Sequence, residues 1–269
     1  MNKTTDTTEK KEQKSLNWKV LLIISSAYIT TELNLQGFLS LMPFIKEEFV
    51  LTRAQAGLYS SFYFLSATII AIFSGRIVDI IGSKRGMVFS IFSIGVLIFL
   101  HSMAPIYTVI LLLAFITGFV FSLITPSVSK AIMELISPEN RAVSMCIIHA
   151  GGGIGGFIGA SLLPLFANMF GWRQALLFPS LLAIFLGLIV WKFYQSKSRT
   201  KKNKSEEGYL TSFKNDMILL LKNRYMMCVC CLGFAFGCAV GAIPAHFTLF
   251  LANDLGVSKA LAGLGFGIL

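Results

Sequence analysis

Charged residues are scarce in this sequence: they make up 13% of its 269 residues, whereas hydrophobic residues make up 55%. A soluble domain of this length carries about 25% charged residues, so this scarcity excludes an ordinary soluble protein. The charge that is present is mostly positive, with 23 lysines and arginines against 13 aspartates and glutamates. This excess does not indicate nucleic-acid binding, because the basic residues lie in tails and loops beside apolar runs.

Residues that bind metals or perform catalysis are also few. The three histidines, His101, His149 and His246, lie on different apolar runs. The five cysteines all lie in apolar runs, and Cys228 and Cys231 have CxxC spacing without a second pair near them in the sequence. We therefore expect packing thiols, no metal site and no cofactor. No nucleophile–base arrangement stands out and no ATP-binding motif occurs, which argues against an enzyme.

Long apolar runs are abundant instead. Seven of them approach the ~20 residues that a helix needs to cross a bilayer. They cover residues 20–44, 54–74, 87–103, 106–128, 142–166, 174–193 and 225–250, and an eighth begins near residue 259. The sequence therefore predicts an all-α, polytopic membrane protein. Its expected parts are a cytoplasmic tail (1–17), a six-helix bundle (18–195), a basic cytoplasmic linker (196–223), and span 7 with part of span 8 (224–269).

The cations predict the orientation of the chain in the membrane. If the N-terminus is cytoplasmic, 19 of the 23 lysines and arginines lie on the cytoplasmic side. Only Lys46, Arg53, Arg173 and Lys259 lie on the other side. This is the positive-inside bias of membrane proteins. We expect a multi-pass protein of the cytoplasmic (inner) membrane, with the lipid bilayer as a partner.

A short polar segment, GRIVDIIGSKR at 75–85, separates predicted spans 2 and 3. Its spacing, Gly-x3-Asp-x2-Gly-x-Lys-Arg, resembles the loop between spans 2 and 3 of the major facilitator superfamily of secondary transporters. It departs from the family pattern at Ile80. The resemblance implies two halves that alternate in access, and a latch on the cytoplasmic side in which Gly75 allows close approach of spans. The latch residues are Gly75, Arg76, Asp79, Gly82, Lys84 and Arg85. A tight turn that needs only Gly82 and cations is the alternative.

The chain also repeats itself at an offset of 206 residues. Segment 44–58, FIKEEFVLTRAQAGL, aligns with 250–264, FLANDLGVSKALAGL. In this alignment Glu48 matches Asp254 and Arg53 matches Lys259, and both segments end in Ala-x-Ala-Gly-Leu. Such a repeat is typical of transporters built from two parallel halves, and it predicts a parent protein of about 400 residues. We therefore expect this chain to be a fragment; a last helix that lies elsewhere, such as at the membrane interface, is the alternative.

Glu32 is the only carboxylate well inside a predicted span. A carboxylate at membrane depth usually marks a proton, ion or substrate path. Tyr28, Glu32 and Gln36 share one face of a helix, and the resemblance implies that spans 1 and 4 line the central cavity. The predicted substrate or proton cavity comprises Tyr28, Glu32, Asn34, Gln36, Ser122, Thr125 and Lys130. A structural Glu32 is the alternative, as is a Lys130 that pairs with Glu134 or reaches lipid headgroups.

Predicted span 5 is rich in glycine. Gly151 to Gly156 match GxGxxG formally, but no acidic residue follows at the spacing of a dinucleotide site, so we reject that interpretation. Gly151, Gly155, Gly156 and Gly159 predict close helix–helix packing instead. The run resembles a span-5 signature of exporters in the family, which has proline at the position of Gly156. A Gly-Trp-Arg turn that ends at Arg173 resembles the family's entry into span 6.

These observations predict a secondary active transporter that moves a small solute by alternating access and is coupled to a proton or ion gradient. Its partners would be the small-molecule substrate, the coupling ion and the bilayer, with no nucleic acid. A transport-inactive fragment, or a membrane sensor or interaction protein, is the alternative. The sequence predicts neither the solute nor the oligomeric state.

Overall fold

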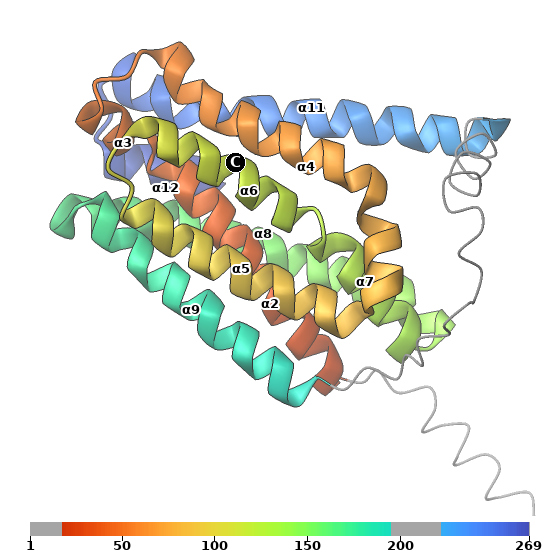
Figure 1. Ribbon diagram of the computed structural model, residues 1–269. Coiled ribbons are helices and arrows are strands. Elements are labelled where there is room, and N and C mark those ends of the chain that lie inside the picture. Colours follow the sequence, from red (N-terminus) through yellow and green to blue (C-terminus); the bar gives the residue numbers. More distant parts are fainter. Residues whose placement is uncertain (1–17, 195–221, 269) are drawn as a thin grey trace, which may run out of the picture.

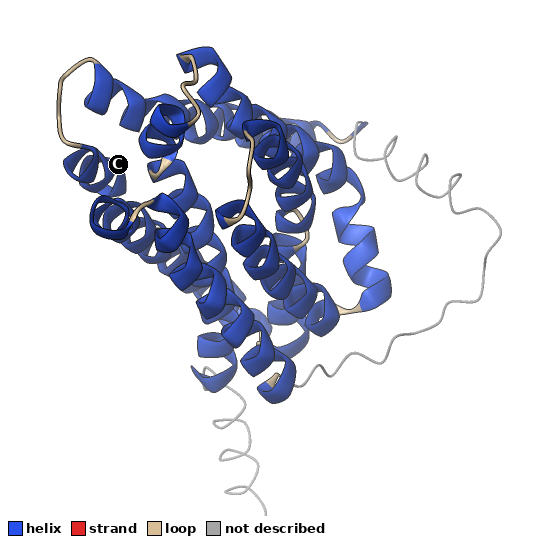
Figure 2. Cartoon of the chain, turned by 60° about the vertical axis from the view of Figure 1, so that its left-hand side comes forward, coloured by secondary structure: helices blue, strands red, loops and turns tan. Residues whose placement is uncertain are grey.

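The computed structural model describes residues 18–194 and 222–268, and every regular element in these ranges is a helix (Figure 2). The all-α prediction is therefore confirmed. The predicted tail (1–17) and nearly all of the predicted linker (196–223) lie outside the described residues. The elements are α2 (Trp18–Ser40), α3 (Met42–Glu48), α4 (Arg53–Ile81), α5 (Ser83–Ser102), α6 (Tyr107–Phe121), α7 (Ile124–Leu135), the short 3-10 helix η1 (Pro138–Asn140), α8 (Arg141–Phe170), α9 (Trp172–Phe193), α11 (Arg224–Asn253) and α12 (Lys259–Ile268).

The helices coincide closely with the predicted spans. Five helical segments of the described chain are long and apolar enough to cross a membrane, namely Arg53–Ile81, Ser83–Ser102, Tyr107–Leu135, Pro138–Phe170 and Trp172–Phe193. Helix α2 falls outside this set, since Glu32, Asn34 and Gln36 interrupt its apolar sequence. The protein is therefore a polytopic membrane protein whose first helix is unusually polar.

The fourth predicted span is broken into α6 and α7 at Ser122 and Leu123. Pro126 explains the break, because proline has no N–H to donate to the carbonyl of Ser122 and its ring crowds that carbonyl. The chain resumes as α7 at Ile124. The bend thus lies beside Thr125, a residue of the predicted cavity.

Single glycines reverse the chain between two pairs of long helices. Gly82 joins α4 to α5 and Gly171 joins α8 to α9, each with φ of 87°. Such left-handed backbone is costly for residues with a side chain and easy for glycine. We call the end of the bundle with the α4–α5 turn the proximal end. The opposite end, with α3 and the α11–α12 turn, is the distal end (Figure 1).

The two sequence repeats fold alike at the distal end. Val50 and Gly256, equivalent at the offset of 206, both have left-handed backbone, with φ of 49° and 64°. The Thr52 hydroxyl accepts the backbone N–H three residues later at 3.2 Å. The equivalent Ser258 hydroxyl does the same at 3.4 Å, so the hydroxyls cap α4 and α12 in the same way. The repeat inferred from residue types is thus present in the backbone.

Helix α11 contacts the bundle near its distal end. Thr248 and Leu249 are buried, whereas residues 222–233 are all exposed. Cys228, Cys230 and Cys231 lie on that exposed first part of α11, and Cys146 of α8 is also free and exposed. The expectation of buried packing thiols is therefore wrong for these four cysteines, because the helix surfaces that carry them pack against no described element.

Candidate functional site

Glycines of α8 bring it into backbone contact with α2. A Cβ atom at Gly155 or at Gly159 would lie 2.3 Å from a backbone carbonyl oxygen of α2, so no side chain fits at either position. Gly151 and Gly156 face α2 side chains less tightly. A Cβ atom at Gly151 would lie 3.2 Å, and one at Gly156 3.0 Å, from the nearest α2 side-chain atom. This close approach fixes which α2 side chains can lie beside α8.

Glu32 lies at this contact, beside Tyr28, Gln36 and Gly152. Its side chain interacts with the Tyr28 hydroxyl and the Gln36 amide, and the Tyr28 hydroxyl also interacts with Thr125 of α7. A Cβ atom at Gly152 would lie 2.6 Å from the Tyr28 ring and 3.2 Å from Glu32 Cγ, so Gly152 makes room for both side chains. We call Tyr28, Glu32, Gln36, Thr125 and Gly152 the Glu32 cluster.

His149 adds an imidazole beside this cluster. Its ring meets the Tyr28 ring edge-on, with centroids 5.2 Å apart and planes at 79°. The sequence interpretation set His149 aside because the histidines lie on different spans. Its position three residues before Gly152 was the available signal, since this spacing places both on the side of α8 that faces α2.

Asn34 lies apart from the Glu32 cluster. Two residues along a helix rotate a side chain by about 200°, so Asn34 points away from Glu32. Its amide donates to the Thr30 carbonyl at 2.8 Å and to the Pro179 carbonyl at 3.4 Å. It borders a small interior cavity of about 10 Å³, lined also by the buried Tyr59. That cavity holds about one water molecule, so Asn34 borders a small polar space inside the bundle.

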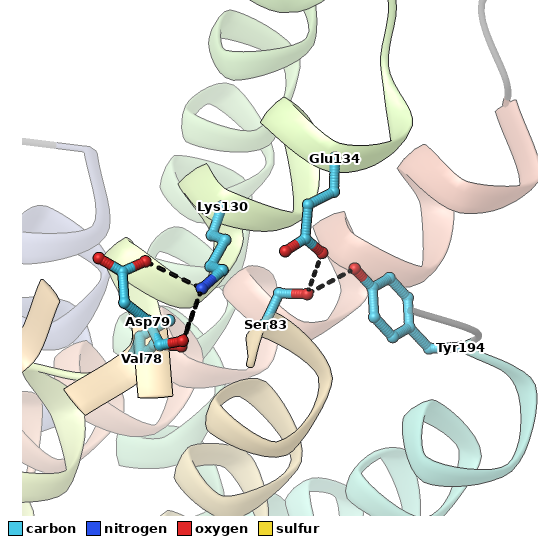
Figure 3. A network of polar contacts seen from close by, with 6 residues as sticks. All are labelled: Val78, Asp79, Ser83, Lys130, Glu134 and Tyr194. Atoms are coloured by element: carbon cyan, nitrogen blue, oxygen red, sulfur yellow. Dashed lines mark hydrogen bonds and ion pairs between the residues drawn. The ribbon is translucent and has the colours of Figure 1, made fainter. Parts of the chain in front are cut away.

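Lys130 lies at the proximal end, beside the last turn of α4 (Figure 3). Its Nζ donates to Asp79 Oδ1 at 2.9 Å, and to the carbonyls of Val78 and Asp79 at 3.2 Å each. A cation is favourable there, because the last carbonyls of α4 carry the negative end of the helix dipole. In this structure Lys130 thus pairs with Asp79, a partner that the alternatives drawn from the sequence did not include. The Ser122 hydroxyl donates to the Phe119 carbonyl of its own helix.

A second polar contact lies beside this pair. The Ser83 hydroxyl donates to Glu134 Oε2 at 2.7 Å and lies 3.3 Å from the Tyr194 hydroxyl. Figure 3 shows the two contacts side by side, joining α4, α5, α7 and the end of α9. We call these six residues, Val78, Asp79, Ser83, Lys130, Glu134 and Tyr194, the proximal cluster. Gly75 has no described atom within 4 Å of a Cβ position, so the described residues make no close approach there.

Trp172 and Arg173 of the Gly-Trp-Arg turn bind the Glu48 carboxylate at the distal end. Arg173 Nη2 donates to Glu48 Oε1 at 2.7 Å, and Trp172 Nε1 donates to the other carboxylate oxygen. Arg173 Nη1 also donates to the carbonyls of Ser102 and Ala104, at 3.0 and 2.8 Å. Burial raises the pKa of Glu48, but the hydrogen bonds from Arg173 and Trp172 and the charge of Arg173 outweigh it. The pKa therefore lies below its ordinary value of 4.5.

Comparisons with known proteins agree with this architecture. The "Uncharacterized transporter BU588" of Buchnera aphidicola subsp. Acyrthosiphon pisum is 28% identical over 225 residues, which are 84% of this chain and 54% of that protein. The sialic acid transporter NanX of Escherichia coli is 24% identical over 227 residues, which are 84% of this chain and 56% of that protein. The chain thus spans about half the length of these relatives.

The likeness extends to solved structures. A crystal structure of a bacterial homologue of the human lysosomal transporter Spinster, inward-facing and occupied, aligns with a TM-score of 0.65 and 20% identity. The alignment covers 94% of this chain and 58% of that chain, and at this identity it shows a shared fold. A family model described as the Major Facilitator Superfamily matches residues 24–269. This chain therefore belongs to the Major Facilitator Superfamily.

Proposed function

We propose that this protein carries out secondary active transport of a small solute by alternating access, with a proton or another cation as the coupling ion and Glu32 as its binding group. The Glu32 cluster carries the proposal. It places one carboxylate in the middle of α2, the first helix of the bundle, where α2 contacts α8. An ionisable group at that depth is costly and is retained where it serves a path through the membrane.

The neighbours of Glu32 favour a coupling role over a structural ion pair. Tyr28 and Gln36 are uncharged polar side chains, as is the Thr125 that contacts Tyr28, and Gly152 offers only backbone. Lys130 is held by Asp79 at the proximal end, so it does not neutralise Glu32. A half-buried charge without a partner is unfavourable, and a bound proton or cation would remove that cost. Loading and release of that ion would then accompany the change of access.

The relatives suggest where to look for the solute. NanX is named for sialic acid, an organic acid. An organic anion beside Glu32 would repel the carboxylate unless a proton or cation arrived with it. Small organic acids are therefore the first solutes to test, and sugars and uncharged compounds follow.

The latch is the second part of the proposal. Asp79, Gly82 and Lys130 tie α4, α5 and α7 together at the proximal end, and the remaining latch residues, Gly75, Arg76, Lys84 and Arg85, lie in or beside the same turn. By the family resemblance this end is cytoplasmic, and the turn would hold that side closed when the other side opens.

The test is uptake into proteoliposomes that contain the chain, with and without an imposed pH gradient, over the solute panel. Glu32→Gln should abolish gradient-driven accumulation, because the amide takes up no proton. Glu139→Gln makes the same chemical change on the exposed η1 turn and should leave uptake as it was. Unchanged uptake and unchanged pH dependence in Glu32→Gln would dismiss Glu32. Native chain that accumulates nothing would favour the transport-inactive alternative.

A further inference from the structure

Two ion pairs cross between the sequence repeats at the distal end. Arg53 Nη2 of the first repeat lies 2.6 Å from Asp254 Oδ1 of the second. Lys259 Nζ of the second repeat pairs with Glu47 Oε2 of the first. Each pair joins residues more than 200 positions apart, and thus connects the N-terminal helices to the α11–α12 region.

The two pairs are reciprocal. Arg53 and Lys259 occupy equivalent positions of the repeat, and each is the first residue of its helix, α4 or α12. Asp254 is equivalent to Glu48, the neighbour of Glu47. Because Arg173 and Trp172 hold Glu48, Glu47 is the acid of the first repeat that meets Lys259. Each repeat therefore gives a cation to the acidic turn of the other, as in a two-fold contact between identical surfaces.

The positions of these cations are unfavourable for the helices that carry them. Arg53 and Lys259 begin α4 and α12, where the positive end of the helix dipole disfavours a cation. The acid of the opposite repeat offsets this cost. The shared left-handed residue and hydroxyl cap described above place each cation in the same way relative to its own turn.

Close helix packing supports the same contact. A Cβ atom at Gly263 would lie 2.4 Å from Pro164 Cγ, and one at Gly267 would lie 2.5 Å from Ser161 Oγ. Helix α12 is therefore pressed against α8 near the distal end. The two ion pairs at this end are partly exposed to solvent.

We propose that Glu47, Arg53, Asp254 and Lys259 form a reciprocal gate, which holds the distal end closed and separates when that end opens. The gate goes beyond the proposed function, since it concerns which end is closed rather than what is carried.

The exposure of the four side chains suits a reversible gate. Arg53 and Asp254 are 60% and 35% exposed, and Lys259 and Glu47 are 32% and 71% exposed. Ion pairs of this exposure change an equilibrium by about two- to five-fold each, so thermal motion can release them. Buried pairs of the same charge would hold the distal end shut far more strongly.

The experiment measures the distance across the distal end by pulsed electron resonance. Nitroxide labels replace the exposed Ile106 and Leu255 in a cysteine-free chain in lipid nanodiscs. Arg53→Asp puts two negative charges opposite each other, at positions 53 and 254. It should raise the fraction of molecules with a long distance between the labels about five-fold. Adding Asp254→Arg should restore the short distance. Likewise, Lys259→Glu alone should lengthen the distance between the labels, and adding Glu47→Lys should restore the short distance.

Lys46→Glu is the matched control, because it reverses one charge on α3 outside the two pairs and should leave the distance unchanged. Arg53→Gln serves as a milder variant should the reversal impair folding, and about 1 M salt should open the native gate by screening. The gate would be overturned if the distribution of label distances were unchanged in all single variants. It would also be overturned if the double variants had the same long distances as the single variants. Restored distances in a chain that transports nothing would support the gate and count against the proposed function.

Discussion

At the scale of single residues, glycines of this chain have two different roles, and one glycine beside them has neither. Gly82 and Gly171 supply left-handed backbone at tight turns. Gly155 and Gly159 remove side-chain volume where α8 meets the α2 backbone. Gly153, only two residues from Gly155, has no described atom within 4 Å of a Cβ position. The same residue type is therefore indispensable at one position and replaceable at the next.

This difference gives a paired prediction. Gly155→Ala should lower the free energy of unfolding by about 2 kcal/mol, because its methyl group overlaps the Ile29 carbonyl and forces the helices apart. Gly153→Ala should keep it or raise it by up to about 1 kcal/mol, since alanine is the better helix former. Denaturant unfolding in detergent, followed by circular dichroism, measures both variants. Equal effects of the two substitutions would contradict the packing described for α8.

At the scale of elements, the contact around Glu48 joins three helices that are distant in the sequence. The carboxylate comes from α3, Trp172 and Arg173 begin α9, and Arg173 also binds carbonyls at the end of α5. Arg173 lies over the Trp172 ring, 4.5 Å from its centroid, which adds a cation–π contact. The contact therefore fixes the distal ends of these helices relative to one another.

Its stabilising effect should depend on pH. The pKa of Glu48 is lowered in the folded protein, so the contact stabilises the fold above the ordinary pKa and is lost as pH falls through the lowered pKa. Glu48→Gln should cost about 0.5–1 kcal/mol at neutral pH, because the pair is partly exposed and screened by solvent. The difference from the native chain should vanish in acid. Thermal unfolding across this pH range measures it, with Glu139→Gln as the control; a pH-independent difference would refute the assignment.

At the scale of the whole molecule, the cations of the distal end are largely paired with acids. At the distal end, Arg53, Arg173 and Lys259 all form ion pairs with acids of the same end. These are three of the four cations that depart from the positive-inside bias of the sequence. Their charge is thus offset locally, which reduces the cost of placing them on the side that the bias disfavours.

The orientation that follows is testable by labelling. In a cysteine-free chain, Val50→Cys at the distal end should react with an impermeant maleimide added to intact cells. Arg85→Cys at the proximal end should react only after the cells are permeabilised. Both positions are exposed, so access to the reagent and not burial decides the result. Reversed labelling would show that the proximal end faces outward.

Much of the architecture was predictable because it depends on local sequence. Span positions follow from the lengths of apolar runs, and the repeat follows from matched residue types such as Arg53 and Lys259. The partners of Lys130 and Asn34 were not predictable in the same way. They depend on how each helix is rotated against neighbours far away in the sequence, and a single sequence contains no direct signal of that rotation. His149 was set aside because the histidines lie on different spans, although its spacing from Gly152 offered a signal.

The backbone contact at Gly155 and Gly159 also limits how the molecule can move. Where two helices meet backbone to backbone, as at these two glycines, they cannot slide or tilt independently without a collision of main-chain atoms. Helix α2, which carries Glu32, and helix α8 should therefore move together as one rigid unit. Bending must then occur elsewhere. The break between α6 and α7 near Pro126, next to Thr125, is the hinge best placed to change the shape of the transport path.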